Sequence, residues 1–202
     1  MRPFYAFSAI LTLPVVRLLY RLRVTGAEHV PRKGGLVLSA NHTSNFDPWP
    51  LCLPLWPRRE GRFMAKSELY NPILKPLLNA TGAFPVRRGQ RDLEAIETAI
   101  QLARSGEMVV MFPEGTRRKK GLVKKFEARP HTGAARIALE AGVPLVPAAI
   151  KGTDRLSRLG PLRVTYGPPI PLDDLRELDP REASQKATDR LMAKIAELEA
   201  SL

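Results

Sequence analysis

The sequence contains one cysteine, Cys52, among its 202 residues. A single cysteine cannot form an internal disulfide, and it excludes metal sites built from several cysteines. Aromatic residues are also scarce, at 6% of the chain, and the basic stretch at residues 117–129 contains one of them, Phe126. Proteins that bind nucleic acids by stacking place aromatic side chains among basic ones. We therefore expect no nucleic acid among the partners of this protein.

A long apolar run is lacking as well. Residues 4–16 (FYAFSAILTLPVV) are apolar, but a spanning helix needs about 20 such residues, and Pro14 interrupts the run. The arginine-rich segment that follows does not resemble the small-residue cleavage site of a secretory signal. Aromatic, aliphatic and arginine residues together are typical of a helix in a membrane interface; the alternative is a helix packed on the protein's own core. We expect residues 1–21 to be an amphipathic, membrane-associating segment and residues 22–202 to form one domain.

Acidic residues are too few to balance the basic ones. Asp and Glu number 20 against 32 Lys and Arg, which leaves a formal net charge of +12. A balance this basic favours an anionic partner, such as an anionic membrane face or a phosphorylated substrate.

Apolar runs and helical patterns alternate along the rest of the chain. Helices are predicted over residues 92–106, 132–142 and 181–202, and strands over residues 22–25, 35–39, 62–64, 83–86, 108–112, 143–150 and 162–166. No internal repeat and no long linker divides the chain. This alternation predicts a single α/β domain with a mixed, mostly parallel sheet flanked by helices.

The segment NHTSNFD follows a predicted buried strand and contains His42 and Asp47. A carboxylate bound to one imidazole nitrogen fixes the tautomer and lets the other nitrogen accept a proton. No nucleophile elbow of the Gly-x-Ser-x-Gly type accompanies the pair, so the nucleophile would belong to the substrate. The pair therefore indicates general-base catalysis of transfer to a hydroxyl. The structural alternative is that the two residues only stabilise a turn.

A second polar segment, FPEGTRR, follows another apolar run. Gly115 permits a tight turn, Thr116 supplies a hydroxyl, and Arg117 offers a planar fork suited to phosphate. Glu114 can orient that arginine. Ligands of α/β sheets bind at the carboxyl ends of the strands, which is where this segment lies.

Basic residues end two further predicted strands. Lys66 follows RFMA, and Arg87 and Arg88 follow GAFPV. Together with Arg117 they predict a site for a phosphorylated alcohol at the carboxyl edge of the sheet.

The segments NHTSNFD, FMAKSELY, GAFPVRRG, FPEGTRR and VPLVPAAIKGT occur in this order between residues 35 and 153. In sequence and spacing they resemble the glycerolipid acyltransferases, and among these most of all the enzymes that acylate 1-acylglycerol 3-phosphate (lysophosphatidic acid). The resemblance implies that His42 deprotonates the sn-2 hydroxyl of this acceptor, which then attacks the thioester of acyl-CoA or acyl-carrier protein to give phosphatidic acid. Asp47 would orient His42.

The resemblance also implies the remaining roles. Lys66, Arg88 and Arg117 would bind the acceptor phosphate, and Glu114, Gly115 and Thr116 would shape that site. No metal or bound cofactor is implied. The partners would be lysophosphatidic acid, the acyl donor and a membrane surface with anionic lipids, so we expect a peripheral protein on the cytoplasmic face of the cell membrane.

Several alternatives remain open at this point. The acceptor can be glycerol 3-phosphate or another lysophospholipid, and the fold can serve a non-catalytic lipid-binding protein. The segment PWPLCLPLWP, residues 48–57, is either a membrane-dipping loop or acyl-tunnel wall, or a buried helix start packed on the sheet. The basic insert at residues 118–129 departs from the family pattern and places His131 near the site in sequence, where it is either a phosphate ligand or a helix-start residue.

Overall fold

Seven strands form one sheet in the order β1-β7-β6-β2-β5-β3-β4 in the computed structural model, which describes residues 2–87, 92–115 and 130–202. The five strands from β6 to β4 are parallel, whereas β7 runs antiparallel to β6 and β1 runs parallel to β7. The strands are β1 (Arg23–Thr25), β2 (Leu36–Ala40), β3 (Gly61–Lys66), β4 (Ala83–Val86), β5 (Met108–Met111), β6 (Leu145–Lys151) and β7 (Arg163–Tyr166). The predicted mixed, mostly parallel sheet is confirmed.

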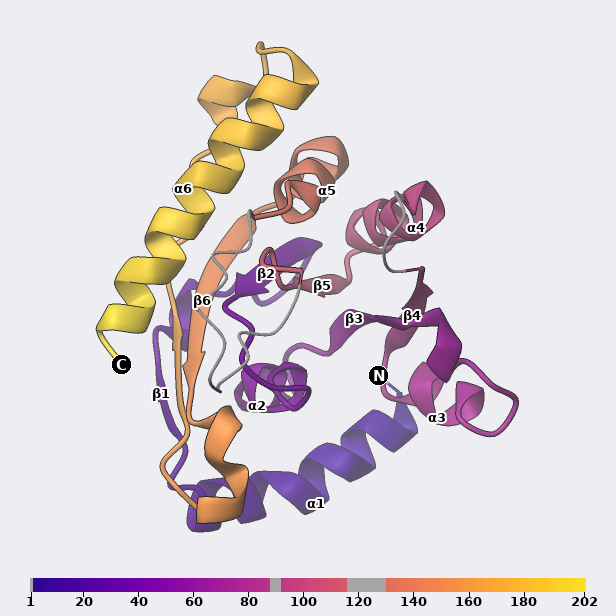
Figure 1. The fold of residues 1–202 in the computed structure, drawn as a ribbon, viewed down its shortest axis with the longest axis vertical. Coiled ribbons are helices and arrows are strands. Elements are labelled where there is room, and N and C mark those ends of the chain that lie inside the picture. The colour runs from indigo at the N-terminus through magenta and orange to yellow at the C-terminus, as the bar shows by residue number, and fades with distance from the viewer. Residues whose placement is uncertain (1, 88–91, 116–129) are drawn as a thin grey trace, which may run out of the picture.

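The helices cover both faces of this sheet. They are α1 (Pro3–Leu19), α2 (Pro48–Cys52), α3 (Lys75–Ala80), α4 (Leu93–Arg104), α5 (Gly133–Ala141) and α6 (Pro180–Ala200), with short 3-10 helices η1 (Ala27–His29), η2 (Leu53–Leu55), η3 (Ser67–Leu69), η4 (Thr153–Arg158) and η5 (Asp173–Leu175). Figure 1 shows α4, α5 and α6 on one side of the sheet and α2 with α1 on the other.

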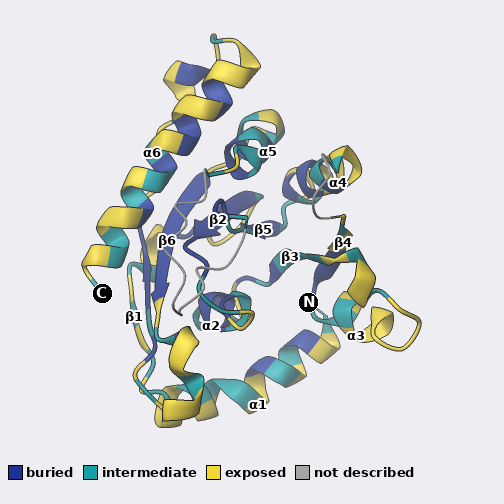
Figure 2. Cartoon of the chain, in the orientation of Figure 1, coloured by how far each residue is buried: buried dark blue, intermediate teal, exposed yellow. Residues whose placement is uncertain are grey.

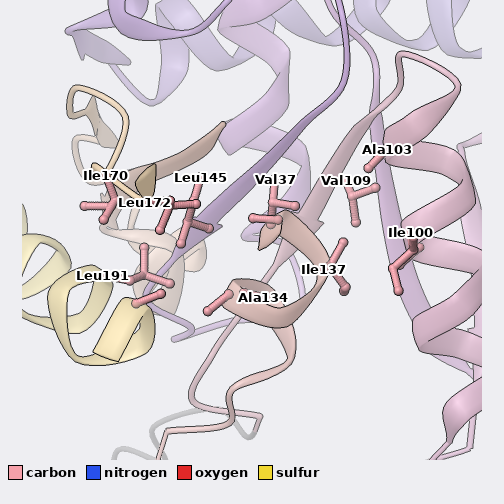
Figure 3. Close-up of a cluster of buried hydrophobic side chains, with 14 of the residues drawn as sticks. Val37, Ile100, Ala103, Val109, Ala134, Ile137, Leu145, Ile170, Leu172 and Leu191 are labelled. Carbon is pink, nitrogen blue, oxygen red and sulfur yellow. The ribbon is translucent and has the colours of Figure 1, made fainter. Parts of the chain in front are cut away.

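Each face of the sheet has its own apolar core. Val37, Val109 and Leu145 point to the face covered by α4, α5 and α6, where they meet Ile137 and Leu191 (Figure 3). The residues that alternate with them, such as Leu36, Leu38 and Val110, join the core around α2. Because both faces are buried, the central strands are apolar at nearly every position, as parallel sheets require (Figure 2).

The local sequence explains where the long helices begin and end. The Asp92 carboxylate accepts a hydrogen bond from the Ala95 N–H at the start of α4, and Asp179 caps α6 in the same way. Gly142, with a φ of 67°, ends α5 in the left-handed conformation that glycine adopts most readily.

Two features of the fold differ from the sequence-based expectations or decide between them. α1 continues through Pro14 to Leu19. Proline has no N–H to donate to the carbonyl of Ile10, four positions earlier, but both residues lie on the exposed side of the helix, where water can bind that carbonyl. The segment at residues 48–57 forms α2 and η2, and its Leu51, Leu53 and Leu55 are at most 1% exposed. It is therefore the buried helix of the two alternatives.

One side of α1 packs against α2, and the other side is exposed. Tyr5 and Ala9 are fully buried, the Tyr5 ring makes an edge contact with Trp49, and the Trp49 indole N–H donates to the Thr12 hydroxyl at 2.9 Å. The rest of the helix exposes large apolar side chains, which are Phe4, Phe7, Ile10, Leu11, Val15, Leu18 and Leu19. Within the part of the chain that the structure describes, no helix has the length and apolar character needed to cross a membrane.

The entry into β2 depends on a glycine. A Cβ atom at Gly35 would lie 1.8 Å from the Ala103 carbonyl oxygen at the end of α4. We expect Gly35→Ala to lower the free energy of unfolding by about 1–3 kcal/mol, because backbone atoms cannot easily move aside. Urea unfolding measures this change. Gly160→Ala is the matched control, since a Cβ there would have no neighbour within 4 Å; equal midpoints for the two variants would contradict the prediction.

Candidate active site

The candidate site lies at the carboxyl end of β2, which is fixed to β6 by an asparagine side chain. The Asn41 amide donates to the Ile150 carbonyl and accepts from the Ile150 N–H, both at 2.9 Å. Asn41 is 1% exposed, so these bonds satisfy a buried amide and extend the pairing of β2 and β6 by one residue. The next residue, His42, therefore leaves the sheet from a fixed position.

The turn after His42 brings Asp47 back onto it. The Asp47 Oδ2 atom lies 2.8 Å from His42 Nδ1 and accepts from the backbone N–H groups of Thr43, at 2.6 Å, and Ser44, at 2.8 Å. Asp47 directly precedes α2, yet its carboxylate does not cap that helix. The carboxylate is fully buried, and the imidazole belongs to a residue that is 6% exposed. This is the contact that the sequence predicted, and the same carboxylate oxygen also stabilises the turn through its backbone N–H groups.

The surroundings of Asp47 decide the tautomer of His42. Backbone N–H groups can only donate, so Oδ2 is an acceptor, and the proton between it and the imidazole is on Nδ1. The lone pair of the neutral ring is then on Nε2. A histidine held in this way can accept a proton from a substrate hydroxyl at Nε2 while the carboxylate stabilises the charge that develops on the ring.

A threonine that lies 106 residues after Asp47 in the sequence completes the surroundings of its carboxylate. Thr153 begins η4 just after β6, is 2% exposed, and donates its hydroxyl to Asp47 Oδ1 at 2.5 Å. The Thr43 hydroxyl lies 2.8 Å from the Thr153 hydroxyl. Sequence reasoning did not single out Thr153. The available signal was its position after a strand, at the end of the segment VPLVPAAIKGT.

Phe112 joins the neighbouring strand to the histidine. Its ring stacks on the His42 imidazole with centroids 4.2 Å apart and an interplanar angle of 20°. Phe112 follows β5, which pairs with β2, so the contact is a consequence of strand order. From the sequence, Phe112 was predicted only as the last residue of a strand, and its contact with His42 was not predicted.

The turn after Phe112 places Glu114 and Gly115 beside this contact. Glu114 is 7% exposed, and the Gly115 N–H donates to the Phe112 carbonyl at 3.0 Å. Gly115 has a φ of 66°, and a Cβ there would lie 2.4 Å from the His131 ring. The His131 N–H donates to the Pro113 carbonyl at 2.8 Å. The structure thus brings His131 to the Glu114–Gly115 turn.

The predicted basic strand ends have different environments. Lys66 ends β3, is exposed, and lies two strands from β2, or about 10 Å across the sheet. Arg87, by contrast, forms an ion pair with Glu94 at 2.8 Å, so it is directed to α4. Arg88, Thr116, Arg117 and the basic insert at residues 118–129 lie outside the described residues.

Ser44 and Cys52 are two potential nucleophiles close to His42 in sequence, and no hydrogen bond joins either side chain to the imidazole in the described residues. The Ser44 hydroxyl accepts a hydrogen bond from the Phe46 N–H at 3.3 Å. Cys52 is 1% exposed within the core around α2, and burial raises the pKa of its thiol to about 12. In the described residues the side chain that is hydrogen-bonded to the His42 ring is therefore the Asp47 carboxylate and not a hydroxyl or a thiol.

Comparison with known proteins identifies related sequences. The model of a family described as Acyltransferase matches residues 21–151. The chain is 31% identical over 202 residues to a 1-acyl-sn-glycerol-3-phosphate acyltransferase of Bacillus subtilis, and the match covers 98% of both chains. It is 35% identical over 136 residues to a protein of Mycoplasma pneumoniae described as a probable enzyme of the same name, where it spans 64% of this chain and 49% of that one.

A solved structure has the same fold. The crystal structure of the 1-acyl-sn-glycerophosphate (LPA) acyltransferase PlsC from Thermotoga maritima superposes with a TM-score of 0.63 at 25% sequence identity. The match covers 96% of this chain and 87% of that one, so it includes the flanking helices as well as the sheet.

The buried thiol gives a prediction about Cys52. Because its pKa is raised to about 12, the thiol stays protonated at pH 8, and a protonated, buried thiol is a poor nucleophile. We expect no reaction with Ellman's reagent in the native protein and rapid reaction of one thiol in urea. Rapid labelling of the native protein at pH 8 would contradict this environment and would make Cys52 a candidate for carrying the acyl group.

Proposed function

This chain belongs to the acyltransferase family, and from that premise we propose that it is a 1-acyl-sn-glycerol-3-phosphate O-acyltransferase, which transfers a fatty acyl group to the sn-2 hydroxyl of lysophosphatidic acid. The observation that carries the proposal is the buried His42–Asp47 pair at the carboxyl end of β2. The pair supplies the general base that direct transfer to a substrate hydroxyl needs. The names of the Bacillus and Thermotoga proteins support the same acceptor.

In the proposed reaction His42 acts as the general base. Its Nε2 atom takes the proton of the acceptor hydroxyl while the oxygen attacks the thioester carbonyl. The C–O bond forms, the C–S bond breaks, and the proton held by His42 passes to the departing thiolate. Asp47 keeps the Nδ1 proton of His42 in place and stabilises the imidazolium between the two proton transfers.

The phosphate of the acceptor distinguishes it from a neutral monoacylglycerol. We assign its binding to Lys66, Arg88 and Arg117, with Glu114, Gly115 and Thr116 shaping the turn beside it. In support of this assignment, Lys66 is exposed at the end of β3, and Glu114 and Gly115 follow β5, on the same edge of the sheet as His42. Charge-assisted bonds to a phosphate would position the glycerol hydroxyl near Nε2.

The acyl donor is a thioester of coenzyme A or of acyl-carrier protein. Both donors are acidic, and a chain with a net charge of +12 attracts either. No metal or bound cofactor takes part in the steps proposed here.

We further propose that the protein docks peripherally on the cytoplasmic face of the cell membrane through α1. Seven large apolar side chains of this helix are at least 40% exposed, an unusual density for a free surface. α3 contacts α1, and the segment that contains it adds the exposed Leu69, Ile73, Leu74 and Leu77. The excess of basic residues favours anionic lipids, which are abundant in that leaflet.

The acyl transfer is tested by thiol release from palmitoyl-CoA and from palmitoyl-carrier protein, with lysophosphatidic acid, glycerol 3-phosphate, monoacylglycerol or no acceptor. We expect release that depends on lysophosphatidic acid and falls by at least about a thousandfold in His42→Ala, since the variant lacks its base. Circular dichroism shows whether the variant keeps its fold. Release without any acceptor would indicate a thioesterase, preference for another acceptor would correct the substrate, and no release from either donor would favour a non-catalytic lipid-binding protein.

Membrane docking is tested by charged substitutions on the exposed side of α1. Leu11 and Leu18 are 59% and 76% exposed, so replacing both by Glu should leave the core unchanged. Burying a leucine side chain in the membrane gains about 1.5–3 kcal/mol, and each change removes a large part of this free energy. We therefore expect binding to phosphatidylglycerol-containing vesicles to be at least tenfold weaker, as measured by co-sedimentation. Leu93→Glu on α4 is the matched control, at 62% exposure on the opposite side of the sheet. Equal co-sedimentation of all variants would contradict docking through α1.

A further inference from the structure

We propose that Thr153 is a positioning residue for the acyl transfer, whose hydroxyl holds the Asp47 carboxylate in the orientation that presents Oδ2 to His42. The catalytic consequence rests on the proposed function, whereas the effect on His42 can be measured without turnover.

The two oxygens of the Asp47 carboxylate are held very differently. Oδ2 receives hydrogen bonds from His42 and from two backbone N–H groups. Oδ1 has Thr153 at 2.5 Å and, at 3.4 Å, the hydroxyl of Thr43. Because Asp47 is fully buried, water does not readily replace a lost donor at Oδ1.

Without the Thr153 hydroxyl, the carboxylate would therefore be free to rotate. The last torsion of an aspartate is broad and has no strong staggered preference, so hydrogen bonds rather than the torsion fix the plane of the group. An Oδ1 atom without its close donor would turn towards Thr43 or the backbone N–H groups. The same rotation moves Oδ2 away from His42 Nδ1, and the imidazole loses the contact that holds its tautomer.

The direction of each hydrogen bond in this cluster is determined by chemistry. The Thr153 hydroxyl has one hydrogen, which goes to Asp47, an acceptor. In the 2.8 Å contact between the two threonine hydroxyls, Thr43 must then be the donor and Thr153 the acceptor. The Thr153 hydroxyl therefore donates to Asp47 and accepts from Thr43, and the second bond keeps its hydrogen directed at Asp47.

The fold places Thr153 there through the end of β6. Gly152 has a φ of 100°, and a Cβ at this position would lie 2.5 Å from the Pro161 carbonyl oxygen, so the turn is both left-handed and closely packed. β6 pairs with β2 in parallel, and the Asn41 amide extends this pairing to Ile150. The turn after β6 therefore meets the turn after β2, and the Thr153 side chain reaches Asp47 from the neighbouring strand.

The test compares Thr153→Val, which exchanges the hydroxyl for a methyl group, with Thr153→Ser, which keeps the hydroxyl. We expect kcat to fall about ten- to a hundredfold in Thr153→Val, because a misplaced catalytic group loses that much, with little change in KM for either substrate. Thr153→Ser should restore most of the lost rate. Thr188→Val is the matched control, since Thr188 is fully buried, donates to the Ser184 carbonyl within α6 and should keep the wild-type rate.

A second measurement follows His42 directly. The imidazole signals of protein carrying nitrogen-15-labelled histidine report the Nδ1 proton, and His42→Ala assigns the signal among the three histidines. We expect Thr153→Val to shift or broaden the His42 signal, with Thr153→Ser and Thr188→Val close to wild type. Should Thr153→Val fail to fold, Thr43→Val removes the donor that orients the Thr153 hydroxyl and should produce a smaller shift in the same signal.

The outcomes separate this inference from the proposed function. A wild-type protein that transfers no acyl group refutes the proposed function, and the His42 signal alone then decides the role of Thr153. An unchanged His42 signal in Thr153→Val, or in Thr43→Val if that variant is used, overturns the inference whatever happens to the rate. An unchanged kcat in Thr153→Val overturns its catalytic part.

Discussion

The rest of the site depends on the hydrogen bonds that the Asp47 carboxylate accepts. This carboxylate is fully buried, and its two oxygens accept from the turn that contains His42, from the imidazole itself and from Thr153. Burying a carboxylate costs free energy unless donors satisfy it, and these contacts supply the donors. The geometry of the histidine is thus a consequence of satisfying one charge in the protein interior. This explains why a turn of six residues, exposed at Asn45 and Phe46, can hold a side chain in a fixed orientation.

The strands on either side of β2 supply the contacts to His42 and Asp47 that come from outside the turn. β2 lies between β6 and β5, and each neighbour contributes one contact at its carboxyl end: Thr153 reaches Asp47 from β6, and Phe112 stacks on His42 from β5. Parallel strands bring their carboxyl ends to one edge, so residues separated by more than a hundred positions along the chain meet there. The Asn41 amide fixes the register of β2 against β6 at the last residue before the histidine.

The same turn is linked to the surface proposed to meet the membrane. Asp47 directly precedes α2, and Trp49 in α2 contacts Tyr5 and Thr12 of α1. At its amino end α1 is attached to the sheet by Arg2, whose guanidinium pairs with Glu107 at 3.2 Å. The exposed apolar side of α1 and the turn that holds His42 are therefore joined through α2.

The sequence determined the periodic and local features of this protein. Seven apolar runs became the seven strands, residues 92–106 and 132–142 became α4 and α5, and the spacing of His42 and Asp47 predicted their contact. These features follow from burial alternation, caps and short turns, which act over a few residues. Only the tertiary structure decided that Pro14 lies inside a continuous helix and that the leucines of residues 48–57 are buried. It also decided that Arg87 pairs with Glu94, and that Phe112 and Thr153 reach the histidine and its carboxylate. Each of these depends on which segments become neighbours when the sheet forms, and strand order is set by packing across the whole domain rather than by any local pattern.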